Sequence, residues 1–185
     1  MNGDPFRTRH MNADLLKSKI RHVPDFPKPG ILFYDITTLL ADAEGLRLAL
    51  DALAAPYVGA GVDLVVGMES RGFIFGAALA DRLGAGFVPV RKVGKLPART
   101  VRVTYDLEYG SDSLEIHADA VTAGQRVLVV DDLLATGGTA RATLDLLSGL
   151  GAEVVACAFL VELTFLQGRA KLGNTPVHAV LPYDA

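Results

Sequence analysis

The chain has 185 residues and a net charge of −3, and 50% of its residues are hydrophobic while 21% are charged. This balance excludes an intrinsically disordered chain and gives no global reason to expect binding to nucleic acid or to a membrane surface. No apolar stretch approaches the roughly 18 residues of a membrane-spanning helix. The single cysteine, Cys157, lies in an apolar run and excludes an internal disulfide, which favours a cytoplasmic location.

The N-terminal part of the chain is polar at first and then rich in proline. Residues 1–11 lack the hydrophobic segment of a signal peptide, and we expect them to form a disordered extension. Apolar spacing predicts a short helix over residues 14–21, and the prolines of residues 23–30 predict a stiff, irregular segment. Residues 31–36 are strand-like. Within them, Phe33 is either an ordinary core residue or a flat wall for an aromatic ligand.

A polar turn separates a predicted strand from a predicted helix in the next part of the chain. Apolar periodicity predicts a helix over residues 44–57, a buried strand over residues 63–67 and another helix over residues 73–83. The turn has the sequence M-E-S-R-G, and its Arg71 would lie at a helix N-terminus, where a cation is unfavourable. A bound anion would remove this conflict. The alternative is an arginine exposed in a loop.

Positive charge gathers after the next predicted strand, residues 87–90. Three cations follow it directly: Arg91, Lys92 and Lys95. They form either a solvated face or a set of contacts to a polyanionic ligand. Alternating residues at 101–108 and 113–117 then predict an exposed antiparallel hairpin, which is a candidate lid over a site.

The most informative stretch is residues 127–140, with the sequence VLVVDDLLATGGTA. Its first four residues predict a strand buried on both faces, which should end at the adjacent carboxylates Asp131 and Asp132. A Thr-Gly-Gly-Thr turn and an amphipathic helix follow, an arrangement that directs backbone N–H groups and the helix dipole at an anion. Carboxylates beside such a cradle suit the hydroxyl groups of a sugar phosphate. The alternative is that they only cap a loop. The stretch has neither the Walker lysine nor the dinucleotide-binding glycine pattern.

Strands and helices alternate through most of the chain. Residues 154–161 and 177–181 are two further predicted strands, with a short helix predicted over residues 164–172 between them. This order predicts an α/β fold with a mainly parallel sheet and helices on both faces. Ligands of such sheets bind beyond the carboxyl ends of the strands. The polar turn, the basic run and the acidic stretch all lie at such ends and should therefore face one crevice.

Six segments resemble, in the same order, those of the type I phosphoribosyltransferases, and several resemble the adenine branch of that family: PDFPKPGILFYDIT, GMESRGFIFG, VRKVGKLP, LEYG, LEIHADA and GQRVLVVDDLLATGGTA. The resemblance implies one phosphoribosyltransferase domain over residues 12–185, with a five-stranded parallel core. It also implies a small hood at residues 12–40 and a flexible lid at about residues 98–118. The implied reaction joins adenine to the ribosyl group of phosphoribosyl pyrophosphate, giving AMP and pyrophosphate in purine salvage. Mg²⁺ as cofactor, bound through the substrate and by no direct protein ligand, and a homodimer are implied as well.

The resemblance also assigns phosphate-binding and catalytic roles to residues of this chain. Asp131 and Asp132 would contact the ribose hydroxyls. The 5′-phosphate would be cradled by Ala135, Thr136, Gly137, Gly138 and Thr139. Pyrophosphate would be bound by Ser70, Arg71, Gly72, Arg91, Lys92 and Lys95. Glu108 would be the lid carboxylate that exchanges a proton with the base, next to Tyr109.

Adenine recognition is assigned to a smaller set by the same resemblance. Phe33 would stack on one face of the base and Leu133 on the other, while backbone groups of Leu32 and Tyr34 would read its edge. The position of Tyr34 is more often basic in the family, so its side chain departs from the pattern. The resemblance further implies a cis peptide bond between Glu69 and Ser70.

Two other functions compete with this interpretation. The chain could use another base, such as hypoxanthine, xanthine or orotate. It could also be a regulator that senses phosphoribosyl pyrophosphate and binds nucleic acid, but such a protein needs an added domain or a basic surface, and the net charge of −3 argues against the latter.

Overall fold

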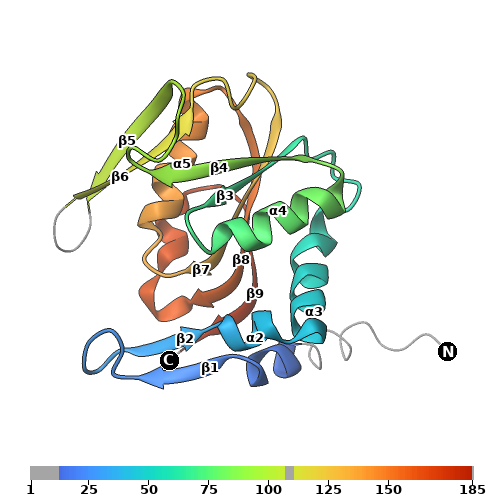
Figure 1. Cartoon of the computed structure of the whole chain (residues 1–185), viewed down its shortest axis with the longest axis vertical. Coiled ribbons are helices and arrows are strands. Elements are labelled where there is room, and N and C mark those ends of the chain that lie inside the picture. Colours follow the sequence, from blue (N-terminus) through green and yellow to red (C-terminus); the bar gives the residue numbers. More distant parts are fainter. Residues whose placement is uncertain (1–12, 107–110, 185) are drawn as a thin grey trace. The chain divides into compact units, whose positions relative to one another are not determined.

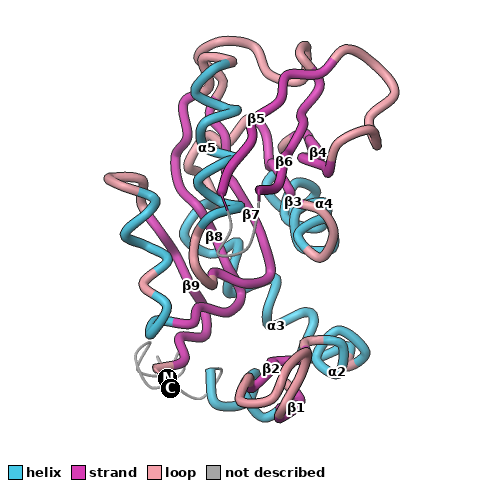
Figure 2. Tube along the Cα trace, turned by 90° about the vertical axis from the view of Figure 1, so that its left-hand side faces the viewer, coloured by secondary structure: helices cyan, strands magenta, loops and turns pink. Residues whose placement is uncertain are grey.

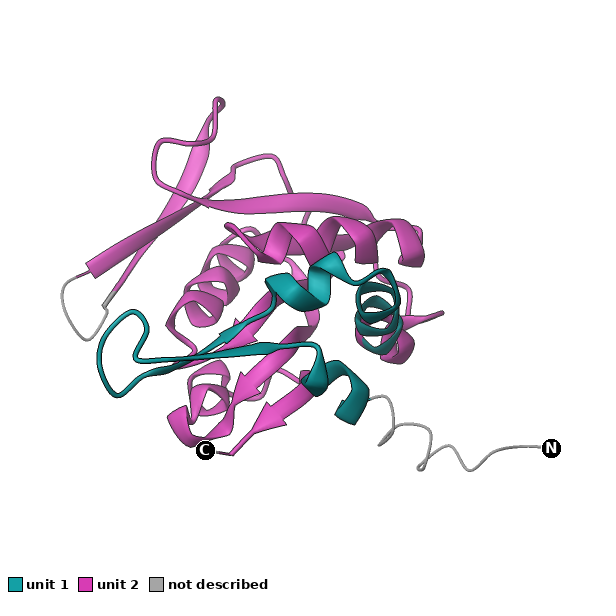
Figure 3. Ribbon diagram, turned by 60° about the horizontal axis from the view of Figure 1, so that its bottom comes forward, with its two compact units in different colours: residues 1–52 teal, residues 53–185 magenta. Residues whose placement is uncertain are grey.

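A computed structural model describes residues 13–106 and 111–184 of the chain (Figure 1). The predicted extension at residues 1–11 and the predicted lid residues Glu108 and Tyr109 lie outside this description. The chain divides into two compact units, residues 1–52 and 53–185, which Figure 3 colours separately. Their boundary falls inside helix α3 (Ala43–Ala54), and each unit is described by itself.

The first unit contains a small two-stranded sheet, β1 (Arg21–Pro24) and β2 (Leu32–Asp35), followed by helix α2 (Thr37–Ala41). The two strands are antiparallel, with Val23 opposite Phe33. Asp25 and Gly30 both have positive φ angles, and an Asp25 carboxylate oxygen accepts a hydrogen bond from the Gly30 N–H at 2.7 Å, which closes the loop between the strands.

Two N-terminal predictions need correction. Only residues 13–18 are helical in the described part of the segment, so the helix predicted over residues 14–21 is too long. Arg21 instead begins β1, where its guanidinium forms an ion pair with Asp35 on β2. The segment predicted to be irregular from residue 23 thus starts as a strand. Pro24 fits there because it ends the strand, where a missing N–H does little harm.

The second unit is built on a seven-stranded sheet in the order β5-β6-β4-β3-β7-β8-β9. Its strands are β3 (Leu64–Met68), β4 (Gly86–Lys92), β5 (Thr100–Asp106), β6 (Ser111–His117), β7 (Arg126–Leu134), β8 (Glu153–Leu163) and β9 (Val177–Tyr183). Five neighbouring strands of this order are parallel, namely β4, β3, β7, β8 and β9, which confirms the predicted parallel core. The β5–β6 hairpin extends the sheet by antiparallel pairing of β6 with β4 (Figure 1).

Two long helices lie on opposite sides of this sheet, as predicted. Helix α4 (Gly72–Leu83) connects β3 to β4, and helix α5 (Gly138–Gly149) connects β7 to β8. The two connections leave the sheet centre in opposite directions, and because such crossovers are right-handed, their helices cover opposite faces (Figure 2). The strand order therefore reverses between β3 and β7. The carboxyl ends of those two strands are the place where ligands bind in open α/β sheets.

Strand β7 is longer than the sequence predicted. Residues 127–130 of the strand are fully buried, as expected for a central strand. The strand does not end at the two aspartates, because pairing with β8 continues through Asp131 to Leu134, which lies opposite Glu162. The carboxylates therefore project from a paired strand and are held more firmly than loop residues would be.

The C-terminal part of the unit also differs in detail. The helix predicted over residues 164–172 is two short 3₁₀ turns, η2 (Thr164–Leu166) and η3 (Gly168–Leu172). They are separated by Gln167, whose φ of 53° interrupts any regular helix. Another 3₁₀ turn, η1 (Ala55–Tyr57), follows α3. Cys157 is buried on β8, and burial raises the pKa of its thiol to about 12.

Among the residues that the structure describes, no helix combines the length and apolar character that a membrane crossing requires.

Candidate active site

The loop between β7 and α5 forms the wall of a pocket. Gly137 is the N-cap of α5 with a φ of 78°, a left-handed conformation that glycine adopts without strain. No side chain caps this helix end, so backbone N–H groups of its first turn remain available to a ligand. The pocket is lined by Met68, Asp131, Leu133, Leu134, Ala135, Thr136, Gly137, Gly138, Thr139, Ala140 and Phe159. All five residues predicted to cradle the 5′-phosphate therefore lie around one pocket.

The two aspartates on β7 lie in different surroundings. Asp132 is 6% exposed, and its carboxylate forms an ion pair with the guanidinium of Arg71. Asp131 is one of the residues that line the pocket, and its carboxylate accepts a hydrogen bond from the Asp132 backbone N–H at 2.9 Å. Burial, together with the negative charge of Asp132, raises the pKa of Asp131 well above its usual value. Asp132 is thus paired with a cation, whereas ionisation of Asp131 lowers the stability of the folded state.

The turn between β3 and α4 lies against this acidic pair. The peptide bond between Glu69 and Ser70 is cis, as the resemblance implied. A Cβ built on Gly72 would lie only 2.8 Å from an Asp131 carboxylate oxygen, so a residue without a side chain is needed at this place. Arg71, the N-cap residue of α4, forms the ion pair with Asp132. The turn and the β7 aspartates, which are far apart in sequence, are thus direct neighbours.

Glu69 holds part of the basic run together. Its carboxylate accepts hydrogen bonds from the Arg91 guanidinium at 3.2 Å, the Lys95 ammonium at 2.5 Å and the Lys92 backbone N–H at 3.1 Å. Burial alone would raise the pKa of Glu69, but the bonds from Lys95, Arg91 and Lys92 outweigh it and lower the pKa to about 2. Arg91, Lys92 and Lys95, three of the predicted pyrophosphate contacts, are therefore gathered around one ionised carboxylate.

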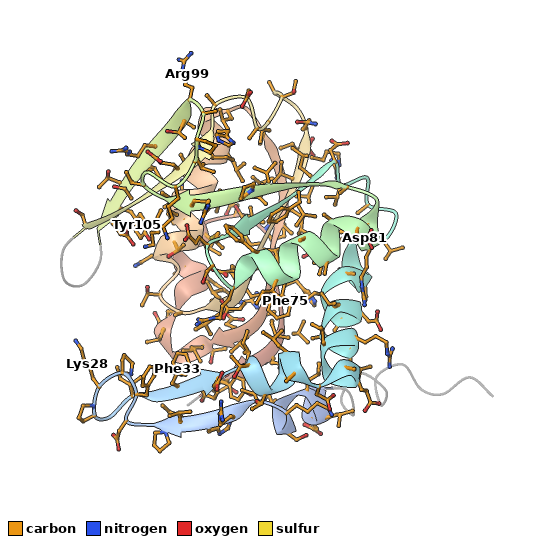
Figure 4. All side chains as sticks on the ribbon, viewed as in Figure 1. Lys28, Phe33, Phe75, Asp81, Arg99 and Tyr105 are labelled. Carbon is orange, nitrogen blue, oxygen red and sulfur yellow. The ribbon has the colours of Figure 1, made fainter. Side chains whose placement is uncertain are left out.

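The β5–β6 hairpin contacts both predicted anion-binding regions. The Lys92 ammonium forms an ion pair with Asp112 on β6. The Tyr105 hydroxyl lies 3.3 Å from the Thr139 hydroxyl and donates a hydrogen bond to Asp112 at 3.3 Å. Tyr105 projects from β5 (Figure 4), and its ring lies 3.6 Å from a Cβ built on Gly138. The hairpin is thereby connected to the phosphate loop and to the basic run.

Three residues of this arrangement were not predicted from the sequence: Glu69, Asp112 and Tyr105. Glu69 and Asp112 have no local signal, because the cations that they pair with lie about twenty or more residues away in the chain. The inward position of Tyr105 could have been predicted from the sequence, because Val101, Val103 and Tyr105 alternate along β5. All three side chains pack against the buried core.

The residues predicted to bind adenine fall in both compact units. Leu32, Phe33 and Tyr34 belong to β2 in the first unit, and Leu133 lines the pocket in the second. Tyr34 is buried, and burial raises the pKa of its hydroxyl. The Phe33 ring packs edge-to-face on Phe26, with centroids 5.1 Å apart. The adenine site stays a prediction.

Comparisons with known proteins agree with this fold and this pocket. The sequence model of the phosphoribosyl transferase domain matches residues 39–173, so the parallel sheet and its pocket are those of a phosphoribosyltransferase. An adenine phosphoribosyltransferase from Acidobacterium capsulatum is 63% identical over 96% of this chain and 98% of its own length. One from Methylococcus capsulatus is 59% identical over 92% of this chain and 99% of its own length.

Solved structures give the same result. The crystal structure of adenine phosphoribosyltransferase from Rhodothermus marinus has a TM-score of 0.89 and 55% identity, covering 94% of this chain and 99% of that chain. The enzyme from Saccharomyces cerevisiae, crystallised with adenine and an imino-altritol bisphosphate, has a TM-score of 0.89 and 44% identity over 93% of this chain and 99% of that one. This chain therefore belongs to the adenine phosphoribosyltransferase family.

Proposed function

We propose that this enzyme transfers the 5-phosphoribosyl group of phosphoribosyl pyrophosphate to adenine at the pocket between β7 and α5, releasing pyrophosphate and forming AMP. The observation that carries the proposal is that Asp131 lines the same pocket as the loop residues 135–139. A phosphate on the loop would leave the ribose hydroxyls beside the aspartates. The anomeric carbon would then be close to the Glu69–Gly72 turn and its cations.

The reaction breaks the bond from the anomeric carbon to pyrophosphate and forms one to a nitrogen of adenine. Positive charge develops on the ribosyl ring, and Asp131 and Asp132 stabilise it as fixed carboxylates. Negative charge develops on the leaving diphosphate, where Arg71, Arg91, Lys92 and Lys95 stabilise it. Backbone groups of Ser70 and Gly72 complete this set. The base also loses a proton, and we propose that the Glu108 carboxylate accepts it. General acid–base catalysis of this kind typically raises the rate by about 10²–10⁴-fold.

Ion-pair exchange accompanies substrate binding in this proposal. Arg71 now pairs with Asp132, while Arg91 and Lys95 pair with Glu69. When the substrate binds, the Arg71 guanidinium binds the diphosphate, and the Asp132 carboxylate accepts a hydrogen bond from a ribose hydroxyl. Each group exchanges one charged or hydrogen-bonding partner for another, which limits the free energy lost by desolvation.

Mg²⁺ is the cofactor that we propose for this reaction. It prefers oxygen ligands and commonly binds through substrate phosphates, waters and one or two carboxylates. The pocket supplies a carboxylate of this kind, Asp131, beside the place of the ribose. The donor set fits an ion carried by the substrate and supported by Asp131 through water. When bound, the ion would neutralise charge on the leaving diphosphate.

For adenine we propose the contacts implied by the family, Phe33 and Leu133 on its two faces and backbone groups of Leu32 and Tyr34 at its edge. The substitution Phe33→Ala tests this set, because losing a stacked ring should weaken adenine binding by about tenfold. Calorimetry measures the affinity. An unchanged value would remove the stacking contact and leave the transfer reaction standing.

We further propose a homodimer located in the cytoplasm. Ile74 on α4 and Val93 after β4 are 44% and 41% exposed, and they lie next to and within the predicted pyrophosphate-binding segments. An apolar surface of this kind is suited to contact with a second copy of the chain. Light scattering should give the mass of two chains, and Ile74→Arg should lower it to one. The buried free thiol of Cys157 fits a reducing compartment, which cell fractionation would test.

A substrate panel tests the proposed function directly. Pyrophosphate release should depend on adenine, with guanine, hypoxanthine and orotate slower by orders of magnitude, because a pocket that hydrogen-bonds a base rejects mismatched analogues. A preference for another base would contradict the adenine assignment.

A further inference from the structure

The 3₁₀ turn η3 lies directly behind the phosphate loop, in backbone-to-backbone contact. A Cβ built on Gly137 would overlap the carbonyl oxygen of Gly168 and lie 3.1 Å from its carbonyl carbon. The left-handed Gly137, which sets the shape of the loop, therefore rests on the first residue of η3. A backbone neighbour cannot rotate away as a flexible side chain can.

The contact is equally close in the other direction. A Cβ built on Gly168 would overlap the carbonyl oxygen of Ala135 and lie 3.1 Å from the Gly137 nitrogen. It would also lie 3.0 Å from a methyl carbon of Leu134. Gly168 thus contacts the beginning and the middle of the loop, and each of the two glycines leaves room for the backbone of the other.

An ion pair between the half-exposed Arg169 and the buried Glu162 anchors η3 to the sheet. Arg169 donates two hydrogen bonds of 2.6 Å to the two carboxylate oxygens of Glu162 and a third of 3.0 Å to the carbonyl oxygen of Val177. Glu162 is 4% exposed and lies opposite Leu134, the last residue of β7. Such a bidentate arginine–carboxylate pair fixes geometry as well as adding stability.

The far end of the turn is anchored by an apolar contact. Leu172, the last residue of η3, is 1% exposed and belongs to the core cluster that includes Leu144 and Leu147 of α5. The turn is therefore held by β8 and β9 through Arg169 and by the core through Leu172. A rigid support of this kind can hold a flexible glycine loop in one conformation.

We propose that Gly168 is a positioning residue for the 5′-phosphate site, and that the Arg169–Glu162 ion pair seats it against the loop. This inference rests on the proposed function, since it takes the loop to be the phosphate cradle. Gly168 does not touch the ligand and acts through the backbone of Ala135 and Gly137. The site thus has a structural part in the C-terminal region, outside the acidic signature stretch.

The test compares Gly168→Ala with Gly149→Ala. A Cβ at Gly149, at the end of α5, meets no atom within 4 Å, so the same chemical change is made without a contact. Gly168→Ala should weaken ribose 5-phosphate binding by roughly tenfold to a hundredfold, because a displacement near 1 Å is costly in a preorganised site. Inorganic pyrophosphate, bound by other segments, should keep its affinity, and Gly149→Ala should bind both ligands as the unchanged protein does. Calorimetry with each ligand gives the comparison.

A second variant leaves the glycine in place. Arg169→Lys keeps the charge but loses the bidentate geometry. We expect a rise of about threefold to tenfold in the KM for phosphoribosyl pyrophosphate with a smaller change in kcat, because loop geometry affects binding before chemistry. This variant keeps the inference testable if Gly168→Ala does not fold.

The outcomes separate the inference from the proposed function. Normal ribose 5-phosphate binding by Gly168→Ala, together with a normal KM for phosphoribosyl pyrophosphate in Arg169→Lys, would overturn the positioning role while leaving the function intact. Equal losses for ribose 5-phosphate and pyrophosphate would also overturn it, because they indicate general damage. If the unchanged protein failed to bind ribose 5-phosphate, the proposed function itself would fail.

Discussion

The two predicted anion-binding regions of the second unit rely on different chemistry. The phosphate loop, residues 135–139, has no charged side chain and presents glycines, hydroxyls and a helix N-terminus. The segments predicted to bind pyrophosphate present four cations, each already paired with a carboxylate: Arg71 with Asp132, Arg91 and Lys95 with Glu69, and Lys92 with Asp112.

The two regions are therefore expected to bind their ligands in different ways. Backbone donors need no counter-charge, so the loop depends on its shape and on the support behind it. Flexible cations without a ligand would repel one another, and the paired carboxylates hold them in place. Binding at the loop should therefore be sensitive to geometry. Binding at the cations should be sensitive to charge and salt.

The largest effect is expected for Asp131→Asn, because Asp131 lies where the two regions meet. Turnover should fall about 100-fold or more if this carboxylate stabilises the ribosyl charge. Stability should rise, since the folded-state pKa of Asp131 lies above its unfolded value and the ionised form is penalised. The gain should be absent below the unfolded pKa of about 4 and should grow as pH rises from there through the folded pKa.

Denaturant unfolding at several pH values, with steady-state kinetics, checks both parts. Asp145→Asn on α5, which removes an exposed carboxylate paired with Arg141, is the matched control. A variant that is less stable at pH 8 would show that Asp131 is held by favourable contacts, contrary to the raised pKa.

The next effect concerns the carboxylate that holds the cations. The folded-state pKa of Glu69 is about 2, below its ordinary value of 4.5, so the ionised form stabilises the fold. That contribution is present above the unfolded pKa and is lost as pH falls from about 4.5 toward 2. Allowing for solvent screening of the partly exposed cations that pair with Glu69, we expect its ionised form to add about 2 kcal/mol to the free energy of unfolding.

The substitution Glu69→Gln should remove this acid-dependent part, which urea unfolding between pH 6 and pH 3 measures. Glu153→Gln, which breaks an exposed pair with Arg126, should leave the pH profile nearly unchanged. A profile for Glu69→Gln that is as steep as that of the original chain would mean that other carboxylates dominate.

Removing one cation should have a smaller and selective effect. We expect Lys95→Gln to weaken inorganic pyrophosphate binding by about tenfold, the size of one charge-assisted hydrogen bond. Ribose 5-phosphate should bind within about twofold of normal, because the loop contains no charged side chain. Calorimetry at two salt concentrations checks this, with Arg47→Gln on α3 as a control that also removes one paired cation. Equal losses for both ligands would erase the distinction between the regions.

The smallest effect is expected at the contact that connects the regions. Tyr105→Phe keeps the ring and removes a hydroxyl that makes two long contacts of 3.3 Å. Stability should fall by less than about 1 kcal/mol, and ribose 5-phosphate affinity by less than about threefold. Thermal unfolding and calorimetry measure both quantities. A tenfold loss of affinity would instead make the hairpin a working part of the phosphate site.

Much of this protein follows from local sequence patterns. Apolar periodicity gave the parallel strands and the two long helices, because a buried strand and an amphipathic helix each leave a distinct repeat. Glycine, threonine and aspartate after a buried strand predicted the phosphate loop and its acidic pair. The catalytic role of Glu108 remains a prediction, since it lies outside the described residues.

Tertiary structure alone decided the features that depend on a partner elsewhere in the chain. Strand β7 continues through Asp131 because β8 pairs with it, and Arg21 joins a strand because Asp35 is opposite. The carboxylates that hold the cations and the turn behind the loop are equally non-local. Hydrophobic spacing acts within a few residues, so the sequence specified the elements and the type of ligand. Which carboxylate faces which cation, and what supports Gly137, depends on sheet order and close backbone packing.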